Sequence, residues 1–114
     1  MSIKFDWDPR KAQRNLRKHR VDFSEASTVF ADTLSITIHD PDHSDDEDRF
    51  VMIGISAATR ILVVIHCYQR QESVIRIISA RKATKNESAQ YHGGVIWKKN
   101  TIFRKQKRTP IFGI

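Results

Sequence analysis

The sequence has little of what several classes of protein require. It contains a single cysteine, Cys67, so no disulfide can form within the chain. Only four of its 114 residues are glycine, and it has no phosphate-binding loop, no paired Cys/His zinc spacing and no Gly-x-Ser-x-Gly turn. No apolar run reaches the roughly 18–20 residues that a transmembrane helix needs. These absences favour a cytoplasmic protein without a membrane anchor and argue against a disulfide-stabilised or nucleotide-cradling domain.

The charge of the chain is unevenly distributed. Lysine and arginine outnumber aspartate and glutamate by 20 to 13, which gives a net charge of +7. An excess of this sign indicates an anionic partner, most commonly a nucleic acid. Six of the basic residues lie in residues 93–114, where no acidic residue occurs, so residues 1–92 carry only +1. We therefore expect one folded domain over residues 1–92 and a basic C-terminal appendage over residues 93–114.

Two helices are predicted in the first third of the chain. Asp8 and Pro9 are typical of a helix start, since Asp8 can accept hydrogen bonds from free backbone N–H groups and proline suits the first helical position. No helix breaker follows until residue 19. The motif Asp22-Phe23-Ser24-Glu25 has the form of a capping box and predicts a second helix that runs to about Phe30.

The apolar spacing then changes from helical to alternating. Strands are predicted over residues 34–39, 49–56, 61–68 and 73–80, with links short enough for antiparallel hairpins between the last three. Thr84 with Glu87 predicts a capped third helix that ends near Tyr91. The expected fold is therefore α+β, in the order α-α-β-β-β-β-α, with an antiparallel four-stranded sheet. The acidic segment 40–48 lacks the glycine and the closing glutamate of an EF-hand loop, so no metal site is expected.

A few polar side chains interrupt the apolar strands. His66 and Arg76 each do so, near the pair Arg81 and Lys82 at a strand end, and Arg49 begins the second predicted strand. Histidine can accept the proton of a ribose 2′-hydroxyl, and arginine can bind the phosphate oxygens on which charge grows, so this set fits RNA cleavage without a metal. A lone histidine in a strand is more often a structural residue, and a purely structural His66 is the alternative.

Other interpretations of these side chains stay open at this stage. Arg76 is also placed to pair with an acidic residue such as Glu72 or Glu87. The basic residues of the first helix, among them Arg14 and Lys18, are typical of a solvated face, of RNA contact or of contact with a protein partner.

One ordered set of residues extends across residues 3–92. It comprises Phe5-Asp6-Trp7-Asp8, Lys11, Asn15, Lys18-His19, Val21, Phe23, Ala26, Val29-Phe30, Asp32, Glu47-Asp48-Arg49-Phe50, Ile53-Gly54, the run from Arg76 to Thr84, Glu87 and Tyr91. This set resembles the BrnT family of toxins from type II toxin–antitoxin systems. The resemblance implies a RelE-like fold, a metal-independent endoribonuclease activity that inhibits translation, and no cofactor.

The resemblance also implies partners and a site. The partners are an RNA substrate and a BrnA-type antitoxin, in a heterotetramer that binds operator DNA through the antitoxin. The catalytic residues expected at matching positions are Arg49, His66, Arg76 and Arg81. The expected RNA-binding residues are Lys82, Tyr91, Arg14 and Lys18. Tyr91 is expected to stack on a base or to position one.

Two departures from the family pattern leave alternatives. Arg20 stands where the family usually has a glycine that ends a helix in a left-handed conformation. Nothing after Gly93 resembles the family. An inactive homologue that only binds antitoxin, acting as a co-repressor, is therefore an alternative function, and a plain RNA-binding module is another.

Overall fold

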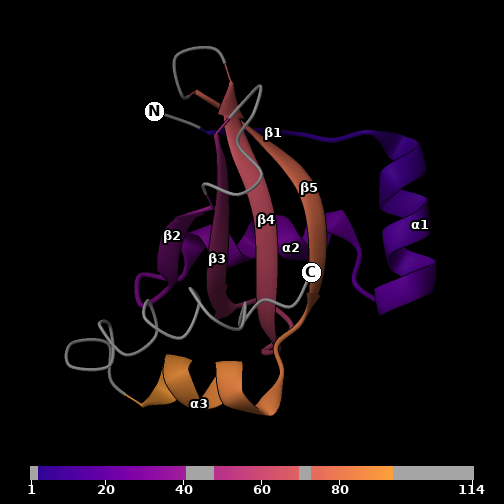
Figure 1. The fold of residues 1–114 in the computed structure, drawn as a ribbon. Coiled ribbons are helices and arrows are strands. Elements are labelled where there is room, and N and C mark those ends of the chain that lie inside the picture. The colour runs from indigo at the N-terminus through magenta and orange to yellow at the C-terminus, as the bar shows by residue number, and fades with distance from the viewer. Residues whose placement is uncertain (1–2, 41–47, 70–72, 94–114) are drawn as a thin grey trace.

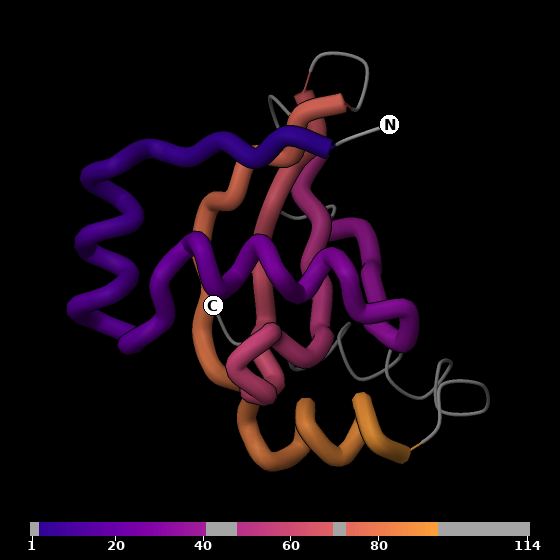
Figure 2. Tube along the Cα trace, turned by 180° about the vertical axis from the view of Figure 1, so that it is seen from behind, coloured from indigo at the N-terminus to yellow at the C-terminus, as the bar shows by residue number. Residues whose placement is uncertain are grey.

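The computed structural model describes residues 3–40, 48–69 and 73–93, which form a five-stranded mixed sheet with three helices around it (Figure 1). The strand order is β1-β5-β4-β3-β2. Helix α2 crosses one face of the sheet, α1 stands beyond the β5 edge, and α3 lies across one end (Figures 1 and 2). The elements are β1 (Lys4–Asp6), α1 (Pro9–His19), α2 (Phe23–Thr28), the 3₁₀ turn η1 (Val29–Ala31), β2 (Ile36–Asp40), β3 (Arg49–Ile55), β4 (Ile61–Gln69), β5 (Val74–Lys82) and α3 (Lys85–His92).

The predicted α+β class and the three helices are confirmed, whereas the predicted element order and the purely antiparallel sheet were wrong. The missed element is β1, which pairs in parallel with Val74–Arg76 of β5. Two of its three residues are charged, so it has no alternating pattern, and its partner lies 70 residues further along the chain. The predicted appendage, residues 93–114, lies outside the described residues except for Gly93.

Apolar side chains cover both faces of the central strands. One layer lies between the sheet and helices α1 and α2, and it is built from Val21, Phe23, Ala26, Val29, Met52, Leu62, Val64, Ile77 and Ala80. The layer on the opposite face contains Val51, Ile53, Val63 and Ile65, with Tyr91 of α3 packed against it. This double coverage explains why β4 is buried continuously from Leu62 to Cys67 instead of alternating.

A β-bulge changes which side chains share a face. In the pairing of β4 with β5, Ile65 faces Ser79 but His66 faces Ile77, so Ile78 is an extra residue. Regular alternation along β5 would place Arg76 and Arg81 on opposite faces of the sheet. Because of the extra residue, both lie on the face opposite α2, where their partners are Cys67 and Val63.

Buried Asn15 joins α1 to the sheet. Its Nδ2 donates to the carbonyl oxygens of Ala80 at 2.7 Å and Val21 at 2.9 Å, and its Oδ1 accepts from the Ala80 N–H at 3.1 Å. Strand β1 pairs with β5 only at Val74–Arg76, so the asparagine amide takes the place of a neighbouring strand at Ala80. The side chain therefore fixes both the position and the rotation of α1.

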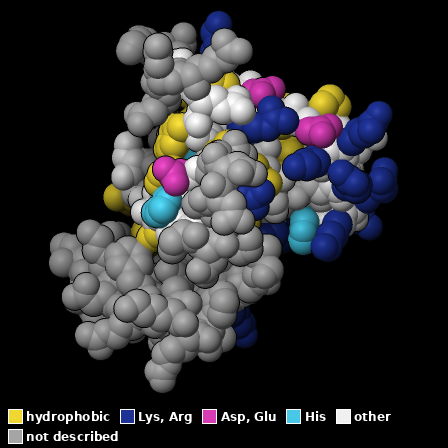
Figure 3. Space-filling model, turned by 45° about the horizontal axis from the view of Figure 1, so that its top comes forward, with side chains coloured by type: hydrophobic (Ala, Val, Ile, Leu, Met, Phe, Trp, Pro, Cys, Tyr) yellow, Lys and Arg dark blue, Asp and Glu magenta, His cyan; other side chains and the backbone are white. Residues whose placement is uncertain are grey.

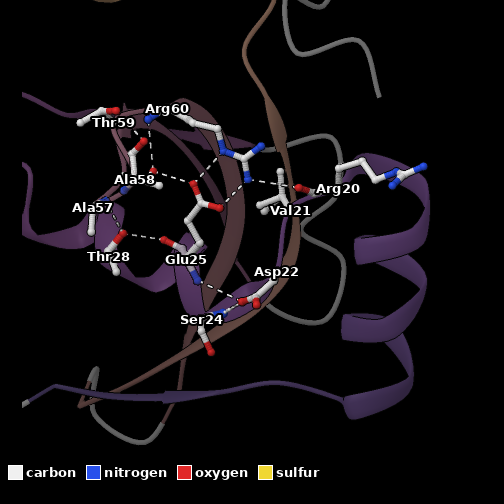
Figure 4. A network of polar contacts seen from close by, with 12 residues as sticks. Arg20, Val21, Asp22, Ser24, Glu25, Thr28, Ala57, Ala58, Thr59 and Arg60 are labelled. Carbon is white, nitrogen blue, oxygen red and sulfur yellow. Dashed lines mark hydrogen bonds and ion pairs between the residues drawn. The ribbon is translucent and has the colours of Figure 1, made fainter.

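A second polar network fastens α2 to the β3–β4 turn (Figure 4). Glu25 accepts from Arg60 Nε at 2.9 Å and from the Ser56 hydroxyl at 2.7 Å, and it also binds Arg60 Nη2. The predicted capping box of α2 is therefore only half formed. Asp22 accepts from the N–H groups of Ser24 and Glu25, but the Glu25 carboxylate turns to Arg60 instead.

The turn after α1 has the conformation that the glycine of the family pattern predicts. Arg20 has φ 60° and ψ 32°, in the left-handed region, and its N–H donates to the Leu16 carbonyl at 2.9 Å. Arg60 also donates to the Arg20 carbonyl at 3.1 Å, which holds this turn in place. A side chain in this region is unfavourable because its Cβ approaches the following carbonyl oxygen.

We therefore expect Arg20→Gly to raise the free energy of unfolding by about 1 kcal/mol, since glycine has no Cβ and the contacts of Arg20 described above use only its backbone. Urea denaturation measures the change. Arg17→Gly is the matched control: it removes the same charge from a helical position in the last turn of α1 and should lower the stability by up to about 1 kcal/mol. Equal effects of the two substitutions would contradict a strained Arg20.

Candidate functional site

His66 lies in the core, on the other face of the sheet from the predicted arginines. It is fully buried, and its ring packs against Phe30 at 4.8 Å, Tyr68 at 5.4 Å and Phe50 at 6.0 Å between centroids. Burial lowers the pKa of His66 to about 4, so the ring is neutral near pH 7. His66 was expected to form one set with Arg76 and Arg81, but the bulge in β5 separates them: regular alternation would place His66 and Arg76 on one face, and the extra residue places them on opposite faces. The predicted catalytic role of His66 stays a prediction, and its surroundings are those of a packing residue.

Arg49 and Arg76 do lie together, in one row across the face opposite α2. The two are paired on either side of Cys67, which places their Cα atoms about 10 Å apart, two strand spacings. Arg76 Nη1 donates to Asp6 Oδ2 at 2.6 Å, and both side chains are partly exposed. The carboxylate that binds Arg76 therefore comes from β1, a partner that the sequence did not indicate.

Arg81 occupies the other end of the same face. It lies five residues beyond Arg76 along β5, or about 16 Å at 3.3 Å per residue, so the prediction that Arg76 lies close to Arg81 and Lys82 was wrong. The Arg81 guanidinium binds Glu87 of α3 with both Nη atoms, at 2.8 Å and 3.0 Å. Glu87 is fully buried and also accepts from the Thr84 N–H, which completes the predicted capping box of α3.

This ion pair gives Arg81 a structural role. Removing Arg81 alone leaves the buried charge of Glu87 without its partner, a change that commonly costs about 3–5 kcal/mol. The exposed neighbour, Lys82, is free of that constraint and accessible to a ligand at the strand end.

Tyr91 packs beside this face and is fixed by a hydrogen bond. Its hydroxyl donates to Asp32 Oδ2 at 2.6 Å, and Asp32 also accepts from the N–H groups of Ile55 and Leu34. Burial, together with the neighbouring Asp32 carboxylate, raises the pKa of Tyr91 to about 12. The phenol therefore stays protonated at neutral pH, and its ring is held against the apolar layer on the sheet face opposite α2.

The predicted RNA-binding residues Arg14 and Lys18 lie on the exposed surface of α1. Figure 3 shows Lys and Arg side chains gathered over this helix, which has no acidic residue between Pro9 and His19. Gln13 and Leu16 line a groove of about 210 Å³ beside Phe23 of α2. Lys11, Arg14 and Lys18 are spaced three and four residues apart on the opposite flank, which therefore points toward the sheet face that carries Arg81.

His19, next to Lys18, belongs to the residue set that resembles the family but was not among the predicted site residues. It is partly exposed, and burial together with the charges of Lys18 and Arg81 lowers its pKa below the ordinary value. The available signal was its spacing of four residues from Asn15, which puts both side chains on one face of the helix.

Within residues 3–40, 48–69 and 73–93, no cluster of three or more His, Cys, Asp or Glu side chains is arranged to hold a metal ion. In the same residues no helix has both the length and the apolar character to cross a membrane.

The burial of His66 predicts a pH dependence of stability. Its folded pKa is about 4 and its ordinary value is 6.5, so the unfolded chain binds more protons between these values and stability falls as the pH drops. Between pH 7 and pH 5 we expect a loss of about 2 kcal/mol, measured by urea denaturation, that His66→Phe removes and the exposed control His39→Phe does not. An unchanged pH slope in His66→Phe would contradict a buried neutral imidazole.

Comparison with known proteins supplies the family. The chain matches a family model described as the ribonuclease toxin BrnT of type II toxin–antitoxin systems over residues 7–87. Among solved structures it is similar to the ribonuclease toxin BrnT of Brucella abortus, with 24% identity, a TM-score of 0.54, and coverage of 74% of this chain and 100% of that one. No curated protein matches. The chain belongs to the BrnT ribonuclease toxin family of type II toxin–antitoxin systems.

Proposed function

We propose that this protein is an endoribonuclease toxin that cleaves RNA without a metal ion and thereby inhibits translation. The observation that carries this proposal is the match of residues 7–87 to a family described as ribonuclease toxins. The charge distribution supports it, because the exposed flank of α1 and the end of β5 offer several cations to a phosphate backbone.

The proposed site is the sheet face opposite α2 together with the basic flank of α1. Arg14, Lys18 and Lys82 are exposed and would contact phosphates. Arg49 and Arg76 at one end and Arg81 at the other are about 16 Å apart, so they would serve different phosphates of one strand. Guanidinium groups suit this role because they donate two parallel hydrogen bonds to phosphate oxygens. Tyr91 would position a base between the two ends.

The protein partner belongs to the same proposal. A type II toxin has an antitoxin partner, and we assign it to the BrnA type, in a cytoplasmic heterotetramer that binds operator DNA through the antitoxin. The flank of α1 that faces α2 exposes Leu16 beside Arg17, a combination that differs from the all-basic opposite flank.

One observation favours a second candidate function. Predicted catalytic side chains are already engaged in the fold: His66 is buried, Arg76 binds Asp6 and Arg81 binds Glu87. An inactive homologue that only binds antitoxin and co-represses its operon would tolerate such pairing. Whether the purified chain cleaves RNA distinguishes the two functions.

We expect the wild-type protein to cleave single-stranded RNA in the presence of EDTA. Lys18→Ala should weaken binding of an uncleavable 2′-deoxy analogue about fivefold and lower the slope of log affinity against log salt by about 0.7, the share of one phosphate contact. Arg17→Ala removes the same charge from the other flank and should change the affinity less than twofold.

Two results would count against the proposal. Absence of cleavage with intact folding would favour the antitoxin-binding homologue. If Lys18→Ala and Arg17→Ala weaken binding of the analogue equally, RNA affinity depends only on the net charge of α1 and not on the flank that faces Arg81.

A further inference from the structure

RNA cleavage without a metal needs a group that accepts the 2′-hydroxyl proton, and histidine is the side chain best matched to neutral pH. The structure describes four of the five histidines, and three of them are poorly placed. His66 is fully buried on the face that α2 covers. His39 lies on β2, at the opposite edge of the sheet from α1, and is paired with Asp48 at 3.3 Å. His92 lies in the last turn of α3, five residues beyond Glu87, the residue of that helix that binds Arg81.

The fourth, His19, is held at the proposed site by the fold. Asn15 binds Ala80 through both its amide atoms, and His19 lies one helical turn further along the same face of α1. Arg81 follows Ala80 on β5, so His19 comes to the strand end where Arg81 and Lys82 lie. Lys18, its neighbour in the chain, is on the flank that points to the same sheet face.

We propose that His19 is a catalytic residue of this ribonuclease and accepts the proton of the attacking 2′-hydroxyl. The inference rests on the proposed ribonuclease function and names a group that the sequence analysis did not assign. The surroundings suit a base: His19 is partly exposed, so its ring is accessible to a ribose, and it lies beside fixed cations that attract the phosphate.

The electrostatics of the site favour the neutral imidazole. Burial lowers the pKa of His19 first, and the cations Lys18 of α1 and Arg81 of β5 lower it further. Two nearby carboxylates are engaged elsewhere: Glu87 of α3 binds Arg81, and Asp22 caps its own helix, α2. Among the described residues no carboxylate is paired with His19 to stabilise the imidazolium, so His19 is unprotonated and ready to accept a proton at pH 7.

The reaction balances with water as the proton donor to the leaving group. His19 takes the 2′-hydroxyl proton as the O2′–P bond forms and the P–O5′ bond breaks, and the departing O5′ takes a proton from water. The products are a 2′,3′-cyclic phosphate and a 5′-hydroxyl, and the imidazolium returns its proton to solvent. Nothing is oxidised or reduced.

The test compares His19→Ala with wild type on a single-stranded RNA in EDTA, with folding of each variant checked by thermal denaturation. We expect single-turnover cleavage to fall at least about 100-fold, the usual share of a general base. Binding of the 2′-deoxy analogue should change less than about threefold. The wild-type rate should increase with pH and reach a plateau, with the midpoint of the increase below pH 6.5. The rate of His19→Ala should not show this increase.

His39→Ala is the matched control, an exposed histidine on the far strand, and should cleave at the wild-type rate. Added imidazole should restore part of the rate of His19→Ala, an effect that a merely structural role does not give. Cleavage by His19→Ala within threefold of wild type, in a wild type that is active, would overturn this inference alone. No cleavage by wild type would overturn the proposed ribonuclease function and the inference with it.

Discussion

Three hydrogen bonds that involve the side chain of Asn15, two donated and one accepted, hold α1 against the edge of the sheet, and the arrangement of the basic surface depends on them. The edge of β5 needs such a partner because β1 covers it only at Val74–Arg76. Further along, the N–H and carbonyl of Ala80 would be left unpaired beside an apolar layer, which costs free energy comparable to a lost hydrogen bond for each group. The amide of Asn15 satisfies both and also binds the Val21 carbonyl, so one side chain serves as a short neighbouring strand and as a helix anchor.

The rotation of α1 follows from this attachment. With Asn15 facing β5, the flank with Lys11, Arg14 and Lys18 is directed to the sheet face that carries the arginines, and Leu16 is directed to the groove beside α2. At the end of the same strand, the Arg81–Glu87 ion pair attaches α3. Strand β5 therefore positions a helix on each side of its C-terminal end, and that end is where the cations from α1 and β5 converge.

Local features of the fold were predictable where they depend on neighbours in sequence. The cap at Asp8 and the capping box of Thr84 and Glu87 are set by residues within one helical turn, whereas the left-handed turn at residue 20 was indicated only by the glycine of the family pattern. Strand β1 was not predictable, because its three residues gain their structure from a partner 70 residues away. The bulge at Ile78 was hidden for a related reason: an extra residue in an apolar run leaves no mark on composition, yet it moves Arg76 and Arg81 to one face. His66 appeared to share that face only while the alternation was taken as regular. The partners of Asn15, Arg76 and Tyr91 come from distant elements, so their roles become visible only in the folded chain.

The most direct measurement of whether Asn15 organises the site combines hydrogen exchange of α1 with RNA cleavage in Asn15→Leu. Leucine keeps the approximate volume and removes all three hydrogen bonds, and Gln13→Leu, on the exposed side of the same helix, is the control. We predict a loss of about 3 kcal/mol in stability. We also expect α1 amides to exchange far faster than those of β4, and cleavage to fall with them, while Gln13→Leu behaves as wild type. Unchanged protection of α1 and unchanged cleavage in Asn15→Leu would contradict the dependence of the basic surface on this attachment.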